Sequence, residues 1–155
     1  MIKLFKILIA AILYHILLFA HCQIPCGIYS DNAEILQIYE DLKTVEKAMN
    51  KIIELSKKGD PQSLNQISRW VASKESHSQN IQRITSEYFL TQRIKENSQK
   101  YVEKVTILHR LLISTMKCKQ SVDQKHVTKS RALLDSFSKI YFDDHDYKHL
   151  KSSAK

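Results

Sequence analysis

Glycine and proline are scarce in this chain, and their scarcity narrows the possible folds more than any other feature. The 155 residues include only 2 Gly and 2 Pro. Strand-rich folds with many tight turns and glycine-rich nucleotide loops both depend on such residues, so both are disfavoured. Hydrophobic residues make up 43% and charged residues 26% of the chain, which is typical of a globular protein. The sequence therefore favours one domain of long helices.

Apolar side chains recur at alternating steps of three and four residues, the spacing that places them on one face of a helix. The helices expected from this pattern cover residues 31–58, 62–90, 98–119 and 121–142. Short connections between four such helices predict an all-α fold, an antiparallel up-down-up-down four-helix bundle over residues 30–142. Residues 143–155 are polar, and we expect them to form a frayed C-terminal tail.

Three local patterns predict where these helices begin. Asp60 followed by Pro61 is typical of an N-cap and the first helical position. Ser121 with Gln124 has the spacing of a capping box, in which two side chains bond to each other's backbone N–H groups. Asp31 opens a similar pattern at the first helix.

Residues 1–20 have the features of a secretory signal peptide. Lys3 and Lys6 form a basic start, and an apolar stretch follows that ends at Ala20. This stretch is short for a membrane span, and His15 interrupts it, although an uncleaved anchor is the alternative. We therefore expect cleavage after Ala20, export to a periplasm or out of the cell, and a mature chain that is not attached to a membrane.

The formal net charge of the chain is +8. This charge either attracts an anionic substrate or is dispersed over surface lysines without a role. No nucleic-acid-binding motif accompanies it, and export argues against such a partner, so we expect none.

Cleavage after Ala20 would make His21 the first residue of a segment, residues 21–29, that we call the hook. It reads HCQIPCGIY. A terminal His21 offers an α-amine and an imidazole, Cys22 offers a thiolate and its amide nitrogen, and Cys26 offers a second thiolate. Two nitrogens and two sulfurs in one plane suit a d⁸ ion such as Ni(II), with the imidazole as an axial ligand.

Pro25 and Gly27 favour a turn that brings the second cysteine back toward the first. Export would equally favour a structural disulfide between Cys22 and Cys26. A zinc site is also chemically possible, although a fourth side-chain ligand is missing. The residues of the hook alone leave these three interpretations open.

The hook resembles the start of mature nickel-type superoxide dismutases, which begin His-Cys-x-x-Pro-Cys-Gly-x-Tyr, and every fixed position is present. The stretches VEKAMNKI, SRWVASKE and YFLTQRI extend the resemblance over residues 21–142. It implies dismutation of superoxide to oxygen and hydrogen peroxide by Ni(III)/Ni(II) cycling. It also implies a homohexamer of four-helix bundles.

The resemblance assigns roles to individual residues. His21, Cys22 and Cys26 would ligate nickel. Tyr29 and Tyr88 would line the open face of the metal and order water or substrate there. These five residues are the expected metal-binding and catalytic set.

The chain also departs from the family pattern around the ligands. Gln23 stands where the family carries an acidic residue. Gln37 stands where a carboxylate accepts a hydrogen bond from the axial imidazole, and Glu34 or Glu40 could replace that carboxylate. His77 stands where an arginine supports the same contact. These changes affect the groups that tune the metal and leave its ligands intact.

A non-catalytic function is the alternative to the enzyme. An exported helical bundle could bind nickel or copper for sequestration or delivery, or it could hold a disulfide between Cys22 and Cys26. Such a protein would bind metal without turning over superoxide.

Overall fold

The computed structural model describes residues 30–153. These residues form helices and contain no strand, which confirms the prediction of an all-α fold. None of the described helices is long and apolar enough to cross a membrane. The expected signal peptide, residues 1–20, and the hook lie outside the described residues.

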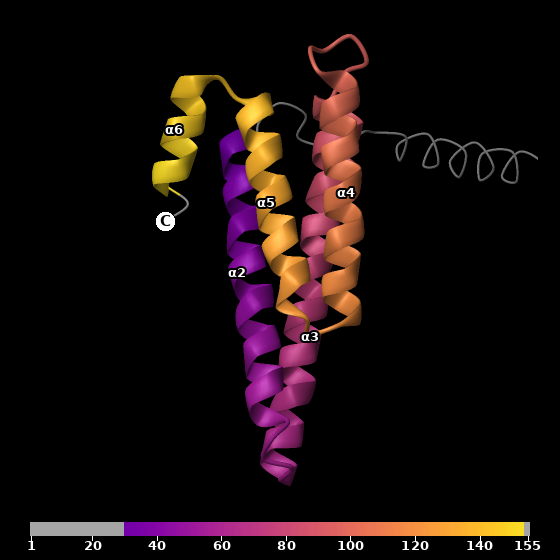
Figure 1. Cartoon of the computed structure of the whole chain (residues 1–155), viewed down its shortest axis with the longest axis vertical. Helices are drawn as coiled ribbons and strands as arrows, with labels where there is room; N and C mark the ends of the chain where they lie inside the picture. The colour runs from indigo at the N-terminus through magenta and orange to yellow at the C-terminus, as the bar shows by residue number, and fades with distance from the viewer. Residues whose placement is uncertain (1–29, 154–155) are drawn as a thin grey trace, which may run out of the picture. The chain divides into compact units, whose positions relative to one another are not determined.

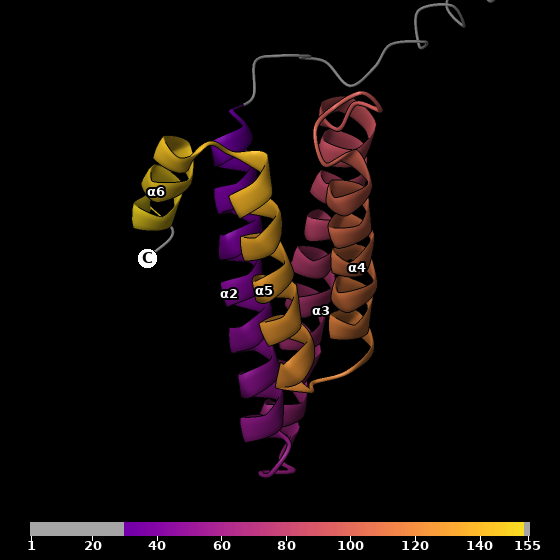
Figure 2. The same ribbon diagram turned by 45° about the horizontal axis from the view of Figure 1, so that its top comes forward.

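Four long helices lie side by side in both views (Figures 1 and 2), and a short sixth element, α6, contacts α2 and α5. The start of α2, the end of α5 and the connection from η1 to α4 lie at one end of this group (Figure 1). The π-helix η1 continues α3 beyond the end expected from the sequence. The elements are α2 (Asp31–Leu55), α3 (Pro61–Arg83), η1 (Ile84–Arg93), α4 (Tyr101–Gln120), α5 (Gln124–Tyr141) and α6 (Asp144–Ser153).

The core forms where the apolar stripes of the long helices meet. On α2, the apolar residues at steps of three and four are fully buried: Ile35, Ile38, Leu42, Val45 and Met49. Phe89 of η1 contacts α5, with ring centroids 5.2 Å from Phe137 and 5.6 Å from Tyr141 in edge-to-face geometry. Aromatic pairs in this geometry add to the stability gained by burial alone. They fix η1 against the last turns of α5.

The observed helix starts agree with one of the predicted caps, Asp60, and differ from another, Ser121. Asp60 is the N-cap of α3, and its Oδ1 accepts a hydrogen bond from Ser63 N at 2.9 Å, as predicted. The prediction that Ser121 begins the next helix is wrong, because Asp123 caps α5 and accepts from Lys125 N at 3.0 Å. Ser121 has an extended backbone instead, because it lies in the short connection that reverses the chain.

The segment expected to be a frayed tail contains α6. Asp143 accepts a hydrogen bond from Asp146 N at 2.8 Å and so caps the start of this helix. Leu150 is fully buried, and Lys151 Nζ lies 2.8 Å from Asp135 Oδ1 on α5. One buried side chain and one cross-helix ion pair hold a segment whose composition alone predicts fraying.

A buried lysine closes the C-terminal end of α4. The last carbonyls of a helix lack partners within the helix. Lys74, on α3, is only 3% exposed, and its Nζ donates to the carbonyl of Cys118 at 2.8 Å and to that of Lys119. A positive charge at this end also interacts favourably with the helix dipole. Lys74 therefore provides hydrogen bonds to the last carbonyls of α4 and links this helix to α3.

We predict that Lys74→Met lowers the free energy of unfolding by about 2–3 kcal/mol, because it leaves buried carbonyls unpaired. Urea denaturation followed by circular dichroism measures the change. The exposed Lys57→Met is the matched control and should unfold close to the wild-type midpoint. Equal midpoints for Lys74→Met and the wild type would show that this ammonium does not stabilise the end of α4.

Candidate functional site

The structure describes three of the predicted site residues, Gln37, His77 and Tyr88. It places them in two separate clusters. The others lie outside the described residues: His21, Cys22, Gln23, Pro25, Cys26, Gly27 and Tyr29.

The first cluster surrounds Asp31, the first residue of α2. Its Oδ1 accepts a hydrogen bond from the Tyr88 hydroxyl at 2.5 Å. Its Oδ2 accepts from the Tyr141 hydroxyl and from Arg93 Nη2, both at 2.7 Å. The carboxylate therefore joins the start of α2 to η1 and to the end of α5, a role different from the local capping box suggested by the sequence.

The π-helical geometry of η1 explains how two of these donors reach one carboxylate. In a π-helix the hydrogen bonds join residues five apart, so residues at this spacing lie one turn apart on the same face. Tyr88 and Arg93 are five apart, and both bond to Asp31. The Arg93 guanidinium also lies 5.7 Å from the centre of the Tyr88 ring. Because π-helical segments occur frequently at functional sites, this one marks η1 as a candidate site element.

These contacts change the acidity of all the groups that can titrate. Burial alone would raise the pKa of Asp31, but the hydrogen bonds from Arg93, Tyr88 and Tyr141 outweigh it and hold the pKa below its usual value. Burial and the bond to Asp31 raise the pKa of Tyr88, and the same causes raise the pKa of Tyr141 to about 12. At neutral pH the carboxylate is charged and both phenols keep their protons.

The second cluster surrounds Asp41, the only fully buried carboxylate among the residues that the structure describes. Gln37 Nε2 donates to its Oδ1 at 3.2 Å, and Asn80 Nδ2 donates to its Oδ2 at 2.7 Å. His77 Nδ1 lies 2.7 Å from Oδ1, and since an ionised carboxylate only accepts, this nitrogen carries the proton. The structure thus brings Gln37 and His77 together at one carboxylate.

Asp41 was not among the acids predicted to replace the missing carboxylate, which were Glu34 and Glu40. Glu40 is exposed and pairs with Lys43 at 2.9 Å, whereas burial raises the pKa of Glu34. One signal could have identified Asp41. It lies four residues after Gln37, so both share one face of α2, and it interrupts the apolar stripe of that helix.

The described residues are all-helical, and a His-Cys-x-x-Pro-Cys sequence precedes them in the chain, a combination that fits the class of small helical metalloproteins. The family of nickel-containing superoxide dismutases matches residues 18–145, and the chain belongs to this family. It is a superoxide dismutase of the nickel type, and nickel is its cofactor. No curated protein and no solved structure matches the chain.

We predict that Asp31→Asn lowers the free energy of unfolding by about 1–3 kcal/mol at pH 7, because it weakens three hydrogen bonds to a charged group. The folded-state pKa of Asp31 is depressed, so its contribution is complete above the unfolded value of about 3.9 and is lost as the pH falls through the lower folded value. The difference between wild type and variant should therefore shrink below about pH 4. Urea denaturation at several pH values measures it.

The exposed Asp144→Asn is the control for this series, since it removes a carboxylate from the same group of helices. It should leave the unfolding midpoint and its pH dependence close to those of the wild type. A stability difference for Asp31→Asn that stays constant from pH 7 to pH 3 would contradict the assignment of a depressed pKa to Asp31.

Proposed function

We propose that the mature chain begins at His21 and dismutates superoxide to oxygen and hydrogen peroxide at nickel held by the hook. The observation that carries this proposal is the family match over residues 18–145, which spans the hook with every fixed position of its pattern. In the overall reaction one superoxide ion loses an electron and leaves as oxygen. A second superoxide ion gains that electron and two protons and leaves as hydrogen peroxide.

The donor set of the hook fits this metal. The proposed ligands are the amine and imidazole of His21, the amide nitrogen and thiolate of Cys22, and the thiolate of Cys26. Anionic sulfur and amide donors would stabilise a higher oxidation state of the metal, and the imidazole of His21 would favour it further. When bound, nickel supplies the Ni(III)/Ni(II) one-electron couple on which dismutation depends.

Tyr29 and Tyr88 are proposed to order water or substrate near the metal, and protons would come from that water or from a protonated group of the hook. The hydrogen bond from Tyr88 to Asp31 fixes the phenol hydroxyl, which favours a role in positioning water or substrate. Because the pKa of Tyr88 is raised, its hydroxyl stays protonated and donates a hydrogen bond to the Asp31 carboxylate. Tyr88 thereby keeps a fixed hydroxyl at the start of α2.

We also propose that Asp41 supplies the negative charge that Gln37 lacks. By resemblance, Gln37 and His77 occupy the positions that support the axial imidazole, and both contact Asp41. Because Gln37 Nε2 donates to Asp41, the orientation of its amide is fixed and its Oε1 is left as an acceptor. Pro25, Gly27 and Gln23 remain the proposed supporting residues within the hook.

The larger organisation is proposed on the same grounds. Residues 1–20 would be a signal peptide that is cleaved, and the mature protein would act in a periplasm or outside the cell. The four long helices would form the antiparallel up-down-up-down bundle over residues 30–142, and six copies would assemble. The side-by-side arrangement of the helices supports the bundle (Figure 2).

We predict that Cys22→Ser and Cys26→Ser each lose nickel and dismutase activity together. Metal analysis, electron paramagnetic resonance and a superoxide assay on the same sample measure this, and the wild type should give a rhombic Ni(III) signal with nitrogen hyperfine splitting. Cys118→Ser is the matched control, because Cys118 is buried on α4 and is not a proposed ligand. This variant should retain nickel and activity. Nickel retained at full activity in either hook variant would refute the ligand assignment.

The same measurements separate the enzyme from the alternatives. A wild-type sample with stoichiometric nickel and no turnover of superoxide would indicate a metal-binding protein without catalysis. A sample with neither nickel nor free hook thiols would indicate a disulfide between Cys22 and Cys26.

We predict that one extra residue before His21 abolishes activity and leaves the helical content unchanged. The extension converts the terminal amine into a peptide nitrogen and so removes one ligand. Circular dichroism and the superoxide assay measure the two properties. One residue added after Lys155 is the control, and an active N-terminally extended form would contradict the role of the amine.

A further inference from the structure

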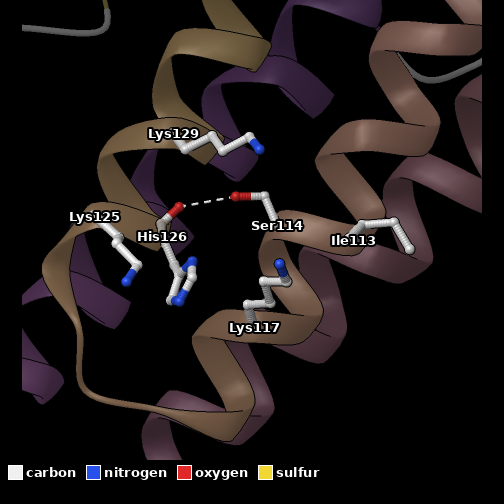
Figure 3. A pocket seen from close by; sticks show the side chains of 6 residues that line it. All are labelled: Ile113, Ser114, Lys117, Lys125, His126 and Lys129. Carbon is white, nitrogen blue, oxygen red and sulfur yellow. Dashed lines mark hydrogen bonds between the residues drawn. The ribbon is translucent and has the colours of Figure 1, made fainter.

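A pocket of about 330 Å³ lies between α4 and the first turns of α5. It is separate from the Asp31 cluster, because Tyr141 lies about 24 Å further along α5 than Lys125. Figure 3 shows the side chains around it, and the lining residues are Ile113, Ser114 and Lys117 of α4 with Lys125, His126 and Lys129 of α5.

Cationic and hydrogen-bonding groups converge on this pocket from both helices. Lys125 and Lys129 are four residues apart, so they share one face of α5. Lys117 faces them from α4, and the Lys129 ammonium turns toward α4 in Figure 3. Each ammonium carries three N–H donors, and the His126 ring carries at least one.

The positive charge of the pocket is only partly balanced. Asp123 pairs with Lys125 at 2.6 Å. Lys117 and Lys129 have no ion-pair partner among the residues that the structure describes, and no carboxylate lines the pocket. The C-terminal end of the α4 dipole stabilises Lys117, but it does not account for Lys129, near the start of α5. A bound anion would balance both lysines.

The floor of the pocket is fixed by hydrogen bonds. The carbonyl oxygen of His126 accepts from Ser114 Oγ at 3.0 Å, drawn in Figure 3, and from Ser130 Oγ at 2.9 Å. Ser114 and Ser130 are both buried. The bond from Ser114 holds the first turns of α5 against α4, and the bond from Ser130 lies within α5. The backbone that carries the lysines is therefore organised before any ligand binds.

We propose that this pocket binds the phosphate group of a small ligand with two or more negative charges. Lysine ammoniums bind phosphate oxygens as point charges. The volume accommodates more than one phosphate group. The phosphate could belong to a soluble compound or to a lipid headgroup.

Calorimetric titration of the mature, nickel-loaded protein with pyrophosphate tests the proposal. The double variant Lys117→Gln, Lys129→Gln should bind at least about tenfold more weakly than the wild type. The matched control is Lys57→Gln, Lys58→Gln, which removes the same charge from exposed positions after α2 and should bind like the wild type. Dismutase activity should be the same in all three proteins, because none of these residues belongs to the nickel site.

A second arm identifies the source of the phosphate. Sedimentation with vesicles of phosphatidylcholine containing phosphatidic acid is compared with vesicles of phosphatidylcholine alone. Lysine-dependent binding to pyrophosphate only assigns a soluble ligand, and lysine-dependent binding to the phosphatidic acid vesicles assigns a headgroup. Either result supports the phosphate site.

The proposal is overturned if the wild type binds neither probe, or if the two double variants weaken binding equally, which would indicate a general effect of net charge. If the double variant of the pocket does not fold, the single variants Lys117→Gln and Lys129→Gln replace it. Each should then bind several-fold more weakly than the wild type. Because activity is measured in parallel, failure of this site is distinguishable from failure of the nickel site.

Discussion

The contacts of the Asp31 carboxylate are the interaction that holds together the end of the helical group at which α2 starts and α5 ends. One side chain holds the first turn of α2 against η1 and the last turn of α5, which come from distant parts of the sequence. Three donors compensate for burial of the charge, and two of them are phenols that must stay protonated to donate. This requirement explains why the pKa of Asp31 falls while the pKa values of Tyr88 and Tyr141 rise. In the sequence, the hook ends at Tyr29, two residues before Asp31.

Asp41 is a second carboxylate whose burial is compensated by hydrogen bonds. A buried carboxylate is costly unless its oxygens are hydrogen-bonded, and Asp41 receives an amide from Gln37, an amide from Asn80 and a ring N–H from His77. Under the proposed function, Gln37 and His77 stand where the resemblance implies a carboxylate and an arginine. In that proposal Asp41 is the acid between α2 and α3, one helical turn beyond Gln37 along α2. The hydrogen bond from Gln37 to Asp41 is the physical argument for assigning both residues to one supporting role.

The sequence predicted those parts of the molecule that depend on local patterns. Helix positions followed from apolar spacing, and the Asp60 cap followed from a short motif, because both reflect interactions within a few residues. The Asp31 and Asp41 clusters require side chains from different helices at one point, which no local pattern encodes. The π-helical geometry of η1 was missed for the same reason, since its sequence also suits an ordinary helix. The three ligands of the hook depended on a motif and a family, and the structure does not describe them.

The positive charges of the chain differ in what they do, and net charge alone conceals the difference. Lys74 is buried and committed to the carbonyls at the end of α4, and Arg93 is committed to Asp31. Lys74 is therefore not available to a ligand in solution, whereas Arg93 is partly exposed but has its charge balanced by Asp31. Lys117 and Lys129 are exposed, face one pocket and lack carboxylate partners within the described part of the chain. Attraction of an anion depends on such uncompensated charges and on where they converge. In this protein the described pocket where they converge lies far along α5 from the Asp31 cluster, so its proposed attraction for anions does not depend on the contacts of that cluster.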